Sequence, residues 1–249
     1  MQPLYGLIGI TLTHSFSPAY FKKKFAAQHI DASYEAFPIP YIRALPALLE
    51  NHPNLVGLNV TIPYKEAVIP YLDETDAVAQ EIGAVNCIVI KNGKKKGYNT
   101  DAGAFEQSLI TSLTPHHTHA LILGTGGSSK TVAFVLEQLG IPYRKVSQNK
   151  KDGLLTYEEL TRELIAEHTL IINTTPVGMY PNIDTAPSIP YYAVGEDHLL
   201  YDLIYNPEET KFLHLGKERG AAIKNGFEML QLQAEASWDL WSANMQMPE

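Results

Sequence analysis

Apolar runs and amphipathic segments alternate along the first hundred residues. Residues 4–10, 33–37 and 55–60 form short runs with the length and composition of β-strands. Residues 18–28 and 42–50 lie between these runs and are predicted to form helices. Because strands that alternate with helices are typical of a mostly parallel sheet covered by helices, we expect an α/β fold.

A second cycle of the same kind starts at residue 120. The apolar run 120–123, a glycine-rich turn, a helix over 129–139 and a strand over 143–147 together predict a βαβ unit. Thr156 and Glu159 have the spacing of a capping box and predict the start of the next helix. We expect two further strands, at residues 169–173 and 199–202, and a last helix at residues 227–241.

Composition limits the functions open to this chain. Its 249 residues suffice for two domains of about 100 to 150 residues each, and a content of 45% apolar residues is typical of soluble globular proteins. The net charge of −8 argues against a nucleic-acid surface. One dense basic run, Lys94 to Lys96, follows a predicted Asn92-Gly93 hairpin turn and is read as solvated. We therefore expect no nucleic-acid partner.

The chain also shows no signal for export or membrane insertion. No stretch approaches the roughly 20 apolar residues of a membrane span, and the first residues lack the basic and apolar regions of a signal peptide. The single cysteine, Cys87, excludes an internal disulfide framework and is read as a small buried strand residue. We expect a cytoplasmic protein that contacts no membrane.

Polar residues gather where the predicted strands end. Asn59, Thr61 and Lys65 follow the apolar run at 55–60, and Pro63 allows a helix to begin at once with Lys65 in its first turn. A cation there opposes the helix macrodipole, which suits a group that gives and takes a proton. The alternative interpretation of Lys65 is a solvated surface lysine.

The glycine-rich turn has the pattern of a dinucleotide site. It runs Gly124-Thr125-Gly126-Gly127-Ser128-Ser129, after an apolar strand and before a helix, with Ser129 at the third small position. Glycines let the chain turn tightly and bring its backbone amides close to a pyrophosphate at the helix N-terminus. The motif alone is a weak signal, and its position between strand and helix strengthens it.

Several short motifs resemble, in order and in spacing, the shikimate dehydrogenase family. They cover nearly the full length of the chain: His14-Ser15-Phe16-Ser17-Pro18, Gly57-x-Asn59-Val60-Thr61-x-Pro63-x-Lys65, Gly83-Ala84-Val85-Asn86, Gly97-x-Asn99-Thr100-Asp101-x-Gly103, Gly124-Thr125-Gly126-Gly127, Asn173-Thr174-Thr175-Pro176-Val177-Gly178-Met179, Asp202-x-x-Tyr205-Asn206-Pro207 and Met229-Leu230-x-x-Gln233-Ala234. Together they are a far stronger signal than the glycine turn.

The resemblance implies an NADP-dependent oxidoreductase of two domains. Its reaction is the reversible reduction of 3-dehydroshikimate to shikimate by NADPH, in chorismate and aromatic amino-acid biosynthesis. A substrate-binding domain with a mostly parallel sheet is expected at residues 1–101 and 221–249, and a Rossmann-like NADP-binding domain at residues 102–220. The last helix is expected to return to the N-terminal domain. The resemblance allows a monomer or a homodimer.

The resemblance also implies which residues do what. Lys65 and Asp101 are the expected catalytic residues: Lys65 supplies the proton for the developing alkoxide, and Asp101 orients the ammonium. Expected substrate contacts are Ser15, Ser17, Asn59, Thr61, Asn86, Thr100, Tyr205 and Gln233. Expected cofactor contacts are Gly124, Thr125, Gly126, Gly127, Ser128, Ser147, Asn149, Lys150, Thr174, Pro176, Leu203, Gly226 and Met229. No metal is required.

The cofactor loop departs from the family's pattern. Gln148 stands where the family usually has an arginine that pairs with the 2′-phosphate of NADP. No carboxylate appears before Asp152, so the acidic residue typical of NAD enzymes is absent, and Lys150 and Lys151 could compensate. We therefore expect a preference for NADP that is weaker than usual.

Other interpretations remain open at this point. Ser15 and Ser17 could instead cap the helix that follows Pro18, and His116, His117 and His119 are read as surface imidazoles rather than metal ligands. His14 is read as local support for the serines. The chain could act on quinate or another hydroxylated cyclohexane acid. A non-catalytic dinucleotide sensor is less favoured, since both Lys65 and Asp101 are present.

Overall fold

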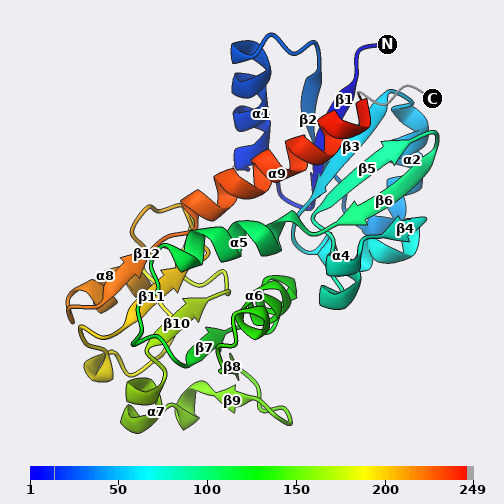
Figure 1. Cartoon of the computed structure of the whole chain (residues 1–249). Helices are drawn as coiled ribbons and strands as arrows, with labels where there is room; N and C mark the ends of the chain where they lie inside the picture. Colours follow the sequence, from blue (N-terminus) through cyan, green and yellow to red (C-terminus); the bar gives the residue numbers. More distant parts are fainter. Residues whose placement is uncertain (14, 246–249) are drawn as a thin grey trace. The chain divides into compact units, whose positions relative to one another are not determined.

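A computed structural model describes residues 1–13 and 15–245 of the chain (Figure 1). His14, read above as local support, lies outside the described residues. The chain divides into two compact units. Unit 1 comprises residues 1–100 and 233–249, and unit 2 comprises residues 101–232.

Unit 1 contains a six-stranded mixed sheet in the order β2-β1-β3-β5-β6-β4. Its strands are β1 (Leu4–Gly9), β2 (Ser33–Pro38), β3 (Leu55–Val60), β4 (Glu74–Thr75), β5 (Cys87–Lys91) and β6 (Lys94–Tyr98). β1 pairs in parallel with β2 and β3, whereas β5 runs antiparallel to β3 and β6. Asn92 and Gly93 connect β5 to β6 with positive φ angles of 51° and 76°, as the predicted hairpin turn requires.

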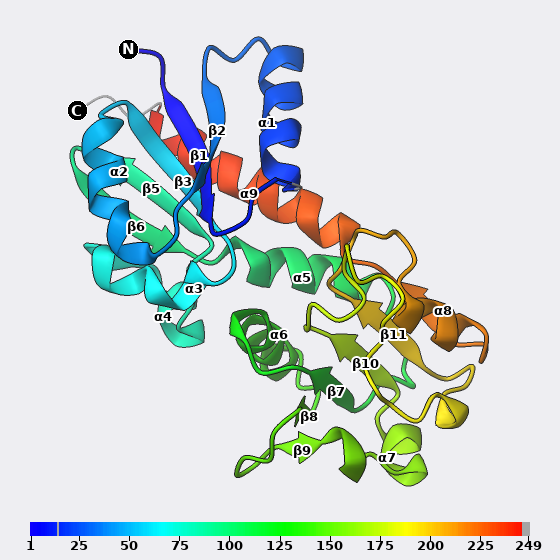
Figure 2. The same cartoon turned by 180° about the vertical axis from the view of Figure 1, so that it is seen from behind.

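Helices cover both faces of this sheet. They are α1 (Phe16–Ala27), α2 (Leu45–Asn51), α3 (Tyr64–Ala67), α4 (Ala77–Ile82) and the C-terminal half of α9 (Phe227–Met245). Successive strand residues point to opposite faces, so Tyr5 packs with α1 and α9, and Leu4 and Ile8 pack with Leu45 of α2. Figure 2 shows α2 on the face opposite to α9.

Trp241 fixes α9 against this sheet. Its side chain is 1% exposed, and its indole Nε1 donates to the carbonyl of Ile88 at 3.0 Å. A Cβ at Gly57 would lie 2.4 Å from that nitrogen, so glycine in β3 permits the close approach. The expected return of the last helix to the N-terminal domain is confirmed by these contacts.

Unit 2 contains a parallel six-stranded sheet in the order β12-β11-β10-β7-β8-β9. Its strands are β7 (Ala120–Leu123), β8 (Tyr143–Ser147), β9 (Leu155–Thr156), β10 (Leu170–Asn173), β11 (Leu199–Asp202) and β12 (Ala222–Lys224). The chain moves outward from β7 in one direction through β8 and β9, and in the other through β10, β11 and β12. This is the doubly wound order of Rossmann domains, and its switch point lies between β7 and β10, where such domains bind nucleotides.

The helices of unit 2 complete two layers. α6 (Gly127–Gln138) connects β7 to β8, and α7 (Arg162–Glu167) and α8 (Lys211–Lys217) pack into a core with the sheet. α5 (Thr100–Ile110) begins at the boundary between the units, and its Phe105 ring meets Tyr201 of β11 at 5.2 Å between centroids. Parallel strands with alternating helices confirm the expected α/β class.

The structure differs from the sequence expectations at the boundaries of the units, where Asp101 also falls in unit 2, and at one capping box. β12 pairs with β11, so residues 221–232 belong to unit 2 rather than to the substrate domain. β12 has only three residues, which is too short for a repeating pattern of apolar and polar residues to be recognised in the sequence. Thr156 and Glu159 do form a capping box, but it caps only a 3₁₀ turn (Tyr157–Glu159), and α7 follows under its own cap, Thr161.

Candidate functional site

The strand ends of unit 1 bring several predicted site residues together. Asn59 lies in β3 and is 4% exposed, Thr61 follows it, and Lys65 lies in the single turn of α3. The backbone N–H of Val60 donates to the carbonyl of Asn86 at 2.8 Å, and that of Val85 donates to the carbonyl of Lys65 at 2.7 Å. The loop that carries Asn86 is therefore tied to the segment that carries Lys65.

Asn86 and Thr100 form a buried pair. The backbone N–H of Thr100 donates to Asn86 Oδ1 at 2.7 Å, and Asn86 Nδ2 donates to Thr100 Oγ1 at 2.9 Å. Their side chains are 3% and 7% exposed. The two bonds fix the orientation of the Asn86 amide, because only its oxygen can accept from the backbone N–H of Thr100.

Asn59 is enclosed by two residues that sequence analysis did not identify. The hydroxyl of Tyr34 donates to Asn59 Oδ1 at 2.8 Å, and Asn59 Nδ2 donates to Ser237 Oγ at 2.9 Å. Ser237 lies on α9 four residues after Gln233 and is fully buried. A polar residue one helical turn after Gln233, on the side occupied by Ala234 and Trp241, is the signal that could have identified it.

The two serines occupy different positions at the start of α1. Ser15 is the N-cap residue but makes no side-chain cap bond, so the capping alternative has no support from its side chain. Ser17 is buried and hydrogen bonds to Tyr34. Burial raises the pKa of Tyr34 well above its usual value, and the Ser17 bond lowers it in part.

The glycine turn of unit 2 has the geometry that a dinucleotide needs. Gly124 has φ +112°, and a Cβ there would lie 2.7 Å from Thr174 Oγ1. Thr174 in turn donates to the carbonyl of Leu123 at 2.7 Å, so the ends of β7 and β10 are joined at the switch point. Gly126 is the N-cap of the twelve-residue α6, where a pyrophosphate fits, and Thr125, Gly127 and Ser128 complete the turn.

Leu203 and Gly226 also lie together in unit 2. The backbone N–H of Gly226 donates to the carbonyl of Ile204 at 3.0 Å, and a Cβ at Gly226 would lie 2.1 Å from the carbonyl oxygen of Leu203. Only glycine fits there. Met229 is buried in the first turn of α9, Tyr205 is half-buried, and Pro176 is exposed.

The end of β8 holds the residues expected at the 2′-phosphate. Ser147 is 8% exposed, and its Oγ accepts from the backbone N–H of Asn149 at 3.2 Å. Lys150 forms an ion pair with Glu159, in which the two side chains are 63% and 41% exposed. This ion pair has no signal in the sequence, because Glu159 lies nine residues from Lys150, beyond a turn.

Asp202 organises the loop after β11. Its carboxylate accepts from Asn173 Nδ2 and the backbone N–H of Ile204, both at 3.0 Å, and from Thr210 Oγ1 at 2.6 Å. Burial raises the pKa of Asp202 to about 6, and the three bonds offset part of that rise. The cluster holds the segment of the family motif that contains Tyr205.

The predicted substrate and catalytic residues are divided between the two units. Asp101 is the first residue of unit 2 and is 7% exposed in the first turn of α5. Tyr205 also belongs to unit 2. Lys65, the serines and Gln233 belong to unit 1.

The histidine cluster requires one correction. His117 is buried rather than at the surface: its Nδ1 accepts from the backbone N–H of Thr114 at 2.9 Å, and burial lowers its pKa. His116 is exposed and His119 is half-buried. Over residues 1–13 and 15–245, no group of three His, Cys, Asp or Glu side chains is placed to hold a metal ion.

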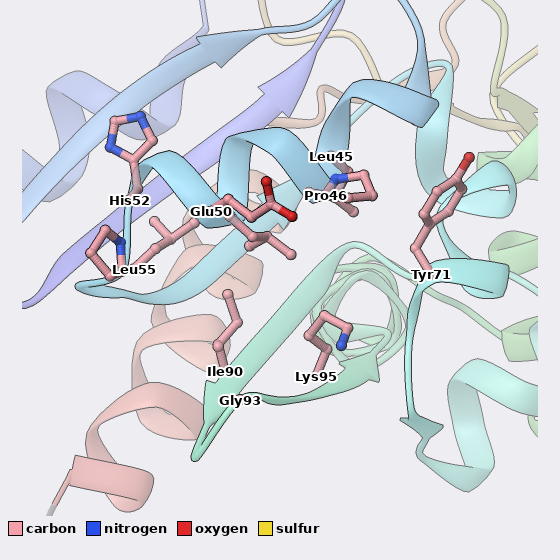
Figure 3. A pocket seen from close by; sticks show the side chains of 11 residues that line it. Leu45, Pro46, Glu50, His52, Leu55, Tyr71, Ile90, Gly93 and Lys95 are labelled. Atoms are coloured by element: carbon pink, nitrogen blue, oxygen red, sulfur yellow. The ribbon is translucent and has the colours of Figure 1, made fainter.

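A pocket of about 550 Å³ lies elsewhere in unit 1 (Figure 3). It opens between α2 and the β5–β6 hairpin, and Leu45, Glu50, Tyr71, Ile90 and Lys95 are among its lining residues. None of the predicted site residues lines it.

Comparison with known proteins identifies the family. The family model described as "Shikimate dehydrogenase substrate binding domain" matches residues 7–88. The shikimate dehydrogenase (NADP(+)) of Bacillus cereus strain 03BB102 is 36% identical over 265 residues, which cover 97% of this chain and 93% of that protein. This chain belongs to the shikimate dehydrogenase family. The family assignment confirms the resemblance seen in the motifs.

Solved structures of shikimate dehydrogenases share the fold over nearly the full length of the chain. Shikimate dehydrogenase 1 of Peptoclostridium difficile superposes with a TM-score of 0.87 at 35% identity, covering 97% of this chain and 92% of that one. The enzyme of Thermus thermophilus, solved with NADP(H) and shikimate, gives a TM-score of 0.86 at 30% identity, covering 99% and 95%.

In the described part of this chain, no helix is both long and apolar enough to cross a membrane.

Proposed function

We propose that this chain catalyses the reversible, NADP-dependent interconversion of shikimate and 3-dehydroshikimate. The observation that carries the proposal is the Thermus thermophilus structure with NADP(H) and shikimate, which matches 99% of this chain at 30% identity. The curated relatives named shikimate dehydrogenase (NADP(+)) support the same activity. The chain retains a lysine, an aspartate and the amide and hydroxyl groups that such a reaction needs.

Unit 1 supplies the proton and most of the substrate contacts in this proposal. Reduction of the ring ketone creates an alkoxide, and the Lys65 ammonium donates the proton to that oxygen; in the oxidation direction Lys65 accepts it. Asp101 orients the ammonium and accepts from a ring hydroxyl. Ser15, Ser17 and Tyr205 border the substrate carboxylate, to which Ser15 and Tyr205 donate. Thr61, Asn86 and Gln233 bind the ring hydroxyls, and Asn59 and Thr100 complete this polar set.

Unit 2 fits a dinucleotide at its switch point. The α6 N-terminus and the amides of residues 124–128 would hold the pyrophosphate, and a Cβ at Gly124 would press against Thr174 beside this turn. Ser147, Asn149 and Lys150 hold the 2′-phosphate, while Thr174, Pro176, Leu203, Gly226 and Met229 border the remainder of the cofactor. When bound, NADPH supplies the hydride.

Initial rates on a substrate panel test the proposal. Purified protein is assayed with shikimate and with quinate, each with NADP and with NAD at fixed salt, and with 3-dehydroshikimate and NADPH in reverse. We expect the highest kcat/KM with shikimate and NADP. Faster turnover of quinate, or no turnover at all with any pair, contradicts the proposal, and the second result favours a non-catalytic sensor.

A quinate or shikimate dehydrogenase that uses NAD is the second candidate. Gln148 and the Lys150–Glu159 ion pair both weaken the charge available to a 2′-phosphate. A quinate dehydrogenase from Corynebacterium glutamicum, solved with NAD, matches this chain with a TM-score of 0.85 at 26% identity, covering 97% and 94%. The same panel of rates separates the two candidates.

A cytoplasmic location and a monomeric or homodimeric state remain predictions. Light scattering after size-exclusion chromatography measures the oligomeric state, and a mass above that of a dimer contradicts the prediction.

A further inference from the structure

Ser237 is hydrogen bonded to two of the predicted substrate contacts, Asn59 and Thr100. Its hydroxyl has one hydrogen, which it donates to the carbonyl of Gln233 at 2.8 Å. Its oxygen therefore acts as an acceptor toward its other neighbours, Asn59 Nδ2 at 2.9 Å and Thr100 Oγ1 at 3.2 Å. The bond from Ser237 to the Gln233 carbonyl thus fixes the donor and the acceptor in the other two bonds.

Both amide hydrogens of Asn59 are already used in hydrogen bonds. One amide hydrogen goes to Ser237, and the other goes to the carbonyl of Asn86 at 3.3 Å. The Asn59 oxygen accepts from Tyr34. An amide has two hydrogens, so Asn59 has no donor left for a ring hydroxyl.

The hydroxyl group of Thr100 is also occupied by hydrogen bonds within the protein. Its oxygen accepts from Asn86 Nδ2 at 2.9 Å, and its hydrogen has three acceptors within 3.2 Å, in Ser237, Gln233 and Asn86. Asn86 differs, since only one of its amide hydrogens goes to Thr100. The second remains available to a ligand, and its direction is set by the two bonds from Asn86 to Thr100.

We propose that Ser237 is a positioning residue for the substrate site, and that Asn59 and Thr100 belong to the same supporting network rather than touching the substrate. The inference deepens the proposed function and rests on it. In this arrangement Ser237 holds Thr100, Thr100 holds the Asn86 amide, and Asn86 presents one N–H to a ring hydroxyl. α9 thereby sets the geometry of groups that lie on other elements.

Ser237→Ala tests the proposal. The substitution removes the acceptor of one Asn59 amide hydrogen and one of the three acceptors near the Thr100 hydroxyl. The KM for shikimate should therefore rise about tenfold, the effect of one misplaced hydrogen bond. The KM and the Kd for NADP should stay within about twofold. Ser237→Cys keeps the volume with a weak donor and acceptor, and serves as the test variant if the alanine variant does not fold.

Ser108→Ala is the matched control. Ser108 is also fully buried on a helix, and its hydroxyl bonds to the carbonyl of Phe105 at 3.0 Å and to Tyr201 at 2.6 Å. Its loss should lower the melting temperature to a similar extent and leave the KM for shikimate unchanged. An equal rise of KM in both variants shows that Ser237 is merely structural and overturns the proposal.

A double-mutant cycle with Thr100→Val separates positioning from contact. Two residues in one chain of bonds should have coupled effects, so the double variant should raise KM by no more than about twofold over either single variant. If Thr100 touches the ring, the two effects multiply to about a hundredfold, and the proposal fails. Thr100→Ser keeps the hydroxyl and should restore a KM within about threefold of wild type.

The wild-type protein in the same assays distinguishes the failure of this inference from the failure of the proposed function. If it does not oxidise shikimate with NADP, both the proposed function and this inference fall. If it does so and Ser237→Ala has an unchanged KM for shikimate, only the inference falls.

Discussion

The polar strand ends of unit 1 and the nucleotide rim of unit 2 are built in opposite ways. In unit 1, Asn59, Asn86 and Thr100 are 3% to 7% exposed and hydrogen bond to one another. At the end of β8, Lys150 and Glu159 meet in an ion pair whose side chains are 63% and 41% exposed. A buried network tolerates little change, because each group that loses its partner keeps its desolvation penalty, whereas an exposed pair contributes little.

This contrast predicts how each region responds to substitution. The substrate site should be preorganised and lose much activity with each change, while the rim should adjust its cofactor preference gradually. Four substitutions, taken in order of decreasing effect, test that difference.

Lys65→Ala should have the largest effect. It removes the proposed proton donor and should lower kcat by roughly 10² to 10⁴-fold, while NADP binding stays unchanged. Lys94→Ala, an exposed lysine in β6 of the same unit, is the control and should retain wild-type kcat. Steady-state rates and fluorescence titration with NADPH measure the two quantities. A Lys65→Ala variant that retains full turnover would show that this lysine is only a surface residue.

Gly124→Ala should come next. The backbone has φ +112° at this position and a Cβ would lie 2.7 Å from Thr174 Oγ1, so the variant combines strain with a clash inside the cofactor cradle. We expect NADP affinity to fall at least about tenfold, with a loss of roughly 1 to 3 kcal/mol in the free energy of unfolding.

Gly153→Ala is the control for strain alone. Gly153 has φ +76° and nothing within 4 Å of an added Cβ, so its variant should lose stability but keep NADP affinity. Equal affinity losses in both variants would remove the argument for a cradle at Gly124. Isothermal titration with NADP and urea denaturation provide the two measurements.

Gln148→Arg should sharpen the cofactor preference. A guanidinium at the end of β8 adds charge-assisted bonds to the 2′-phosphate, each of about 1.5 to 3 kcal/mol before screening, so NADP affinity should rise about tenfold and NAD affinity should not change. Lys150→Ala should have the opposite effect, although Glu159 already occupies this lysine. A gain that is equal for both cofactors would place the 2′-phosphate elsewhere.

The secondary structure was predicted from the sequence more accurately than the contacts of the site residues. Strands 55–60, 120–123, 143–147 and 199–202 were located to the residue, because apolar runs with clear turn signals define them locally. Tyr34 and Ser237 were missed, since each gains its role only from a partner 25 or 178 residues away. The proposed roles of Asn59 and Thr100 depend on which hydrogen-bond donors are already used inside the fold, and no local sequence pattern shows this.

Asp202→Asn should have the smallest effect on turnover, because its buried carboxylate acts on the loop after β11 in unit 2. Burial raises the pKa of the Asp202 carboxyl to about 6 from an ordinary value of 3.8, so the folded state holds the proton more tightly than the unfolded state. That contribution to stability is fully present below about pH 4 and is lost as the pH rises through 6. The free energy of unfolding of the wild type should therefore fall relative to that of Asp202→Asn, by at most about 3 kcal/mol between pH 4 and pH 7.

Asp197→Asn, at an exposed position in the same unit, is the control, and its free energy of unfolding should change with pH as that of the wild type does. Urea denaturation at each pH measures the difference, and a gap between wild type and Asp202→Asn that stays constant with pH would show that the three hydrogen bonds fully offset burial at this carboxylate.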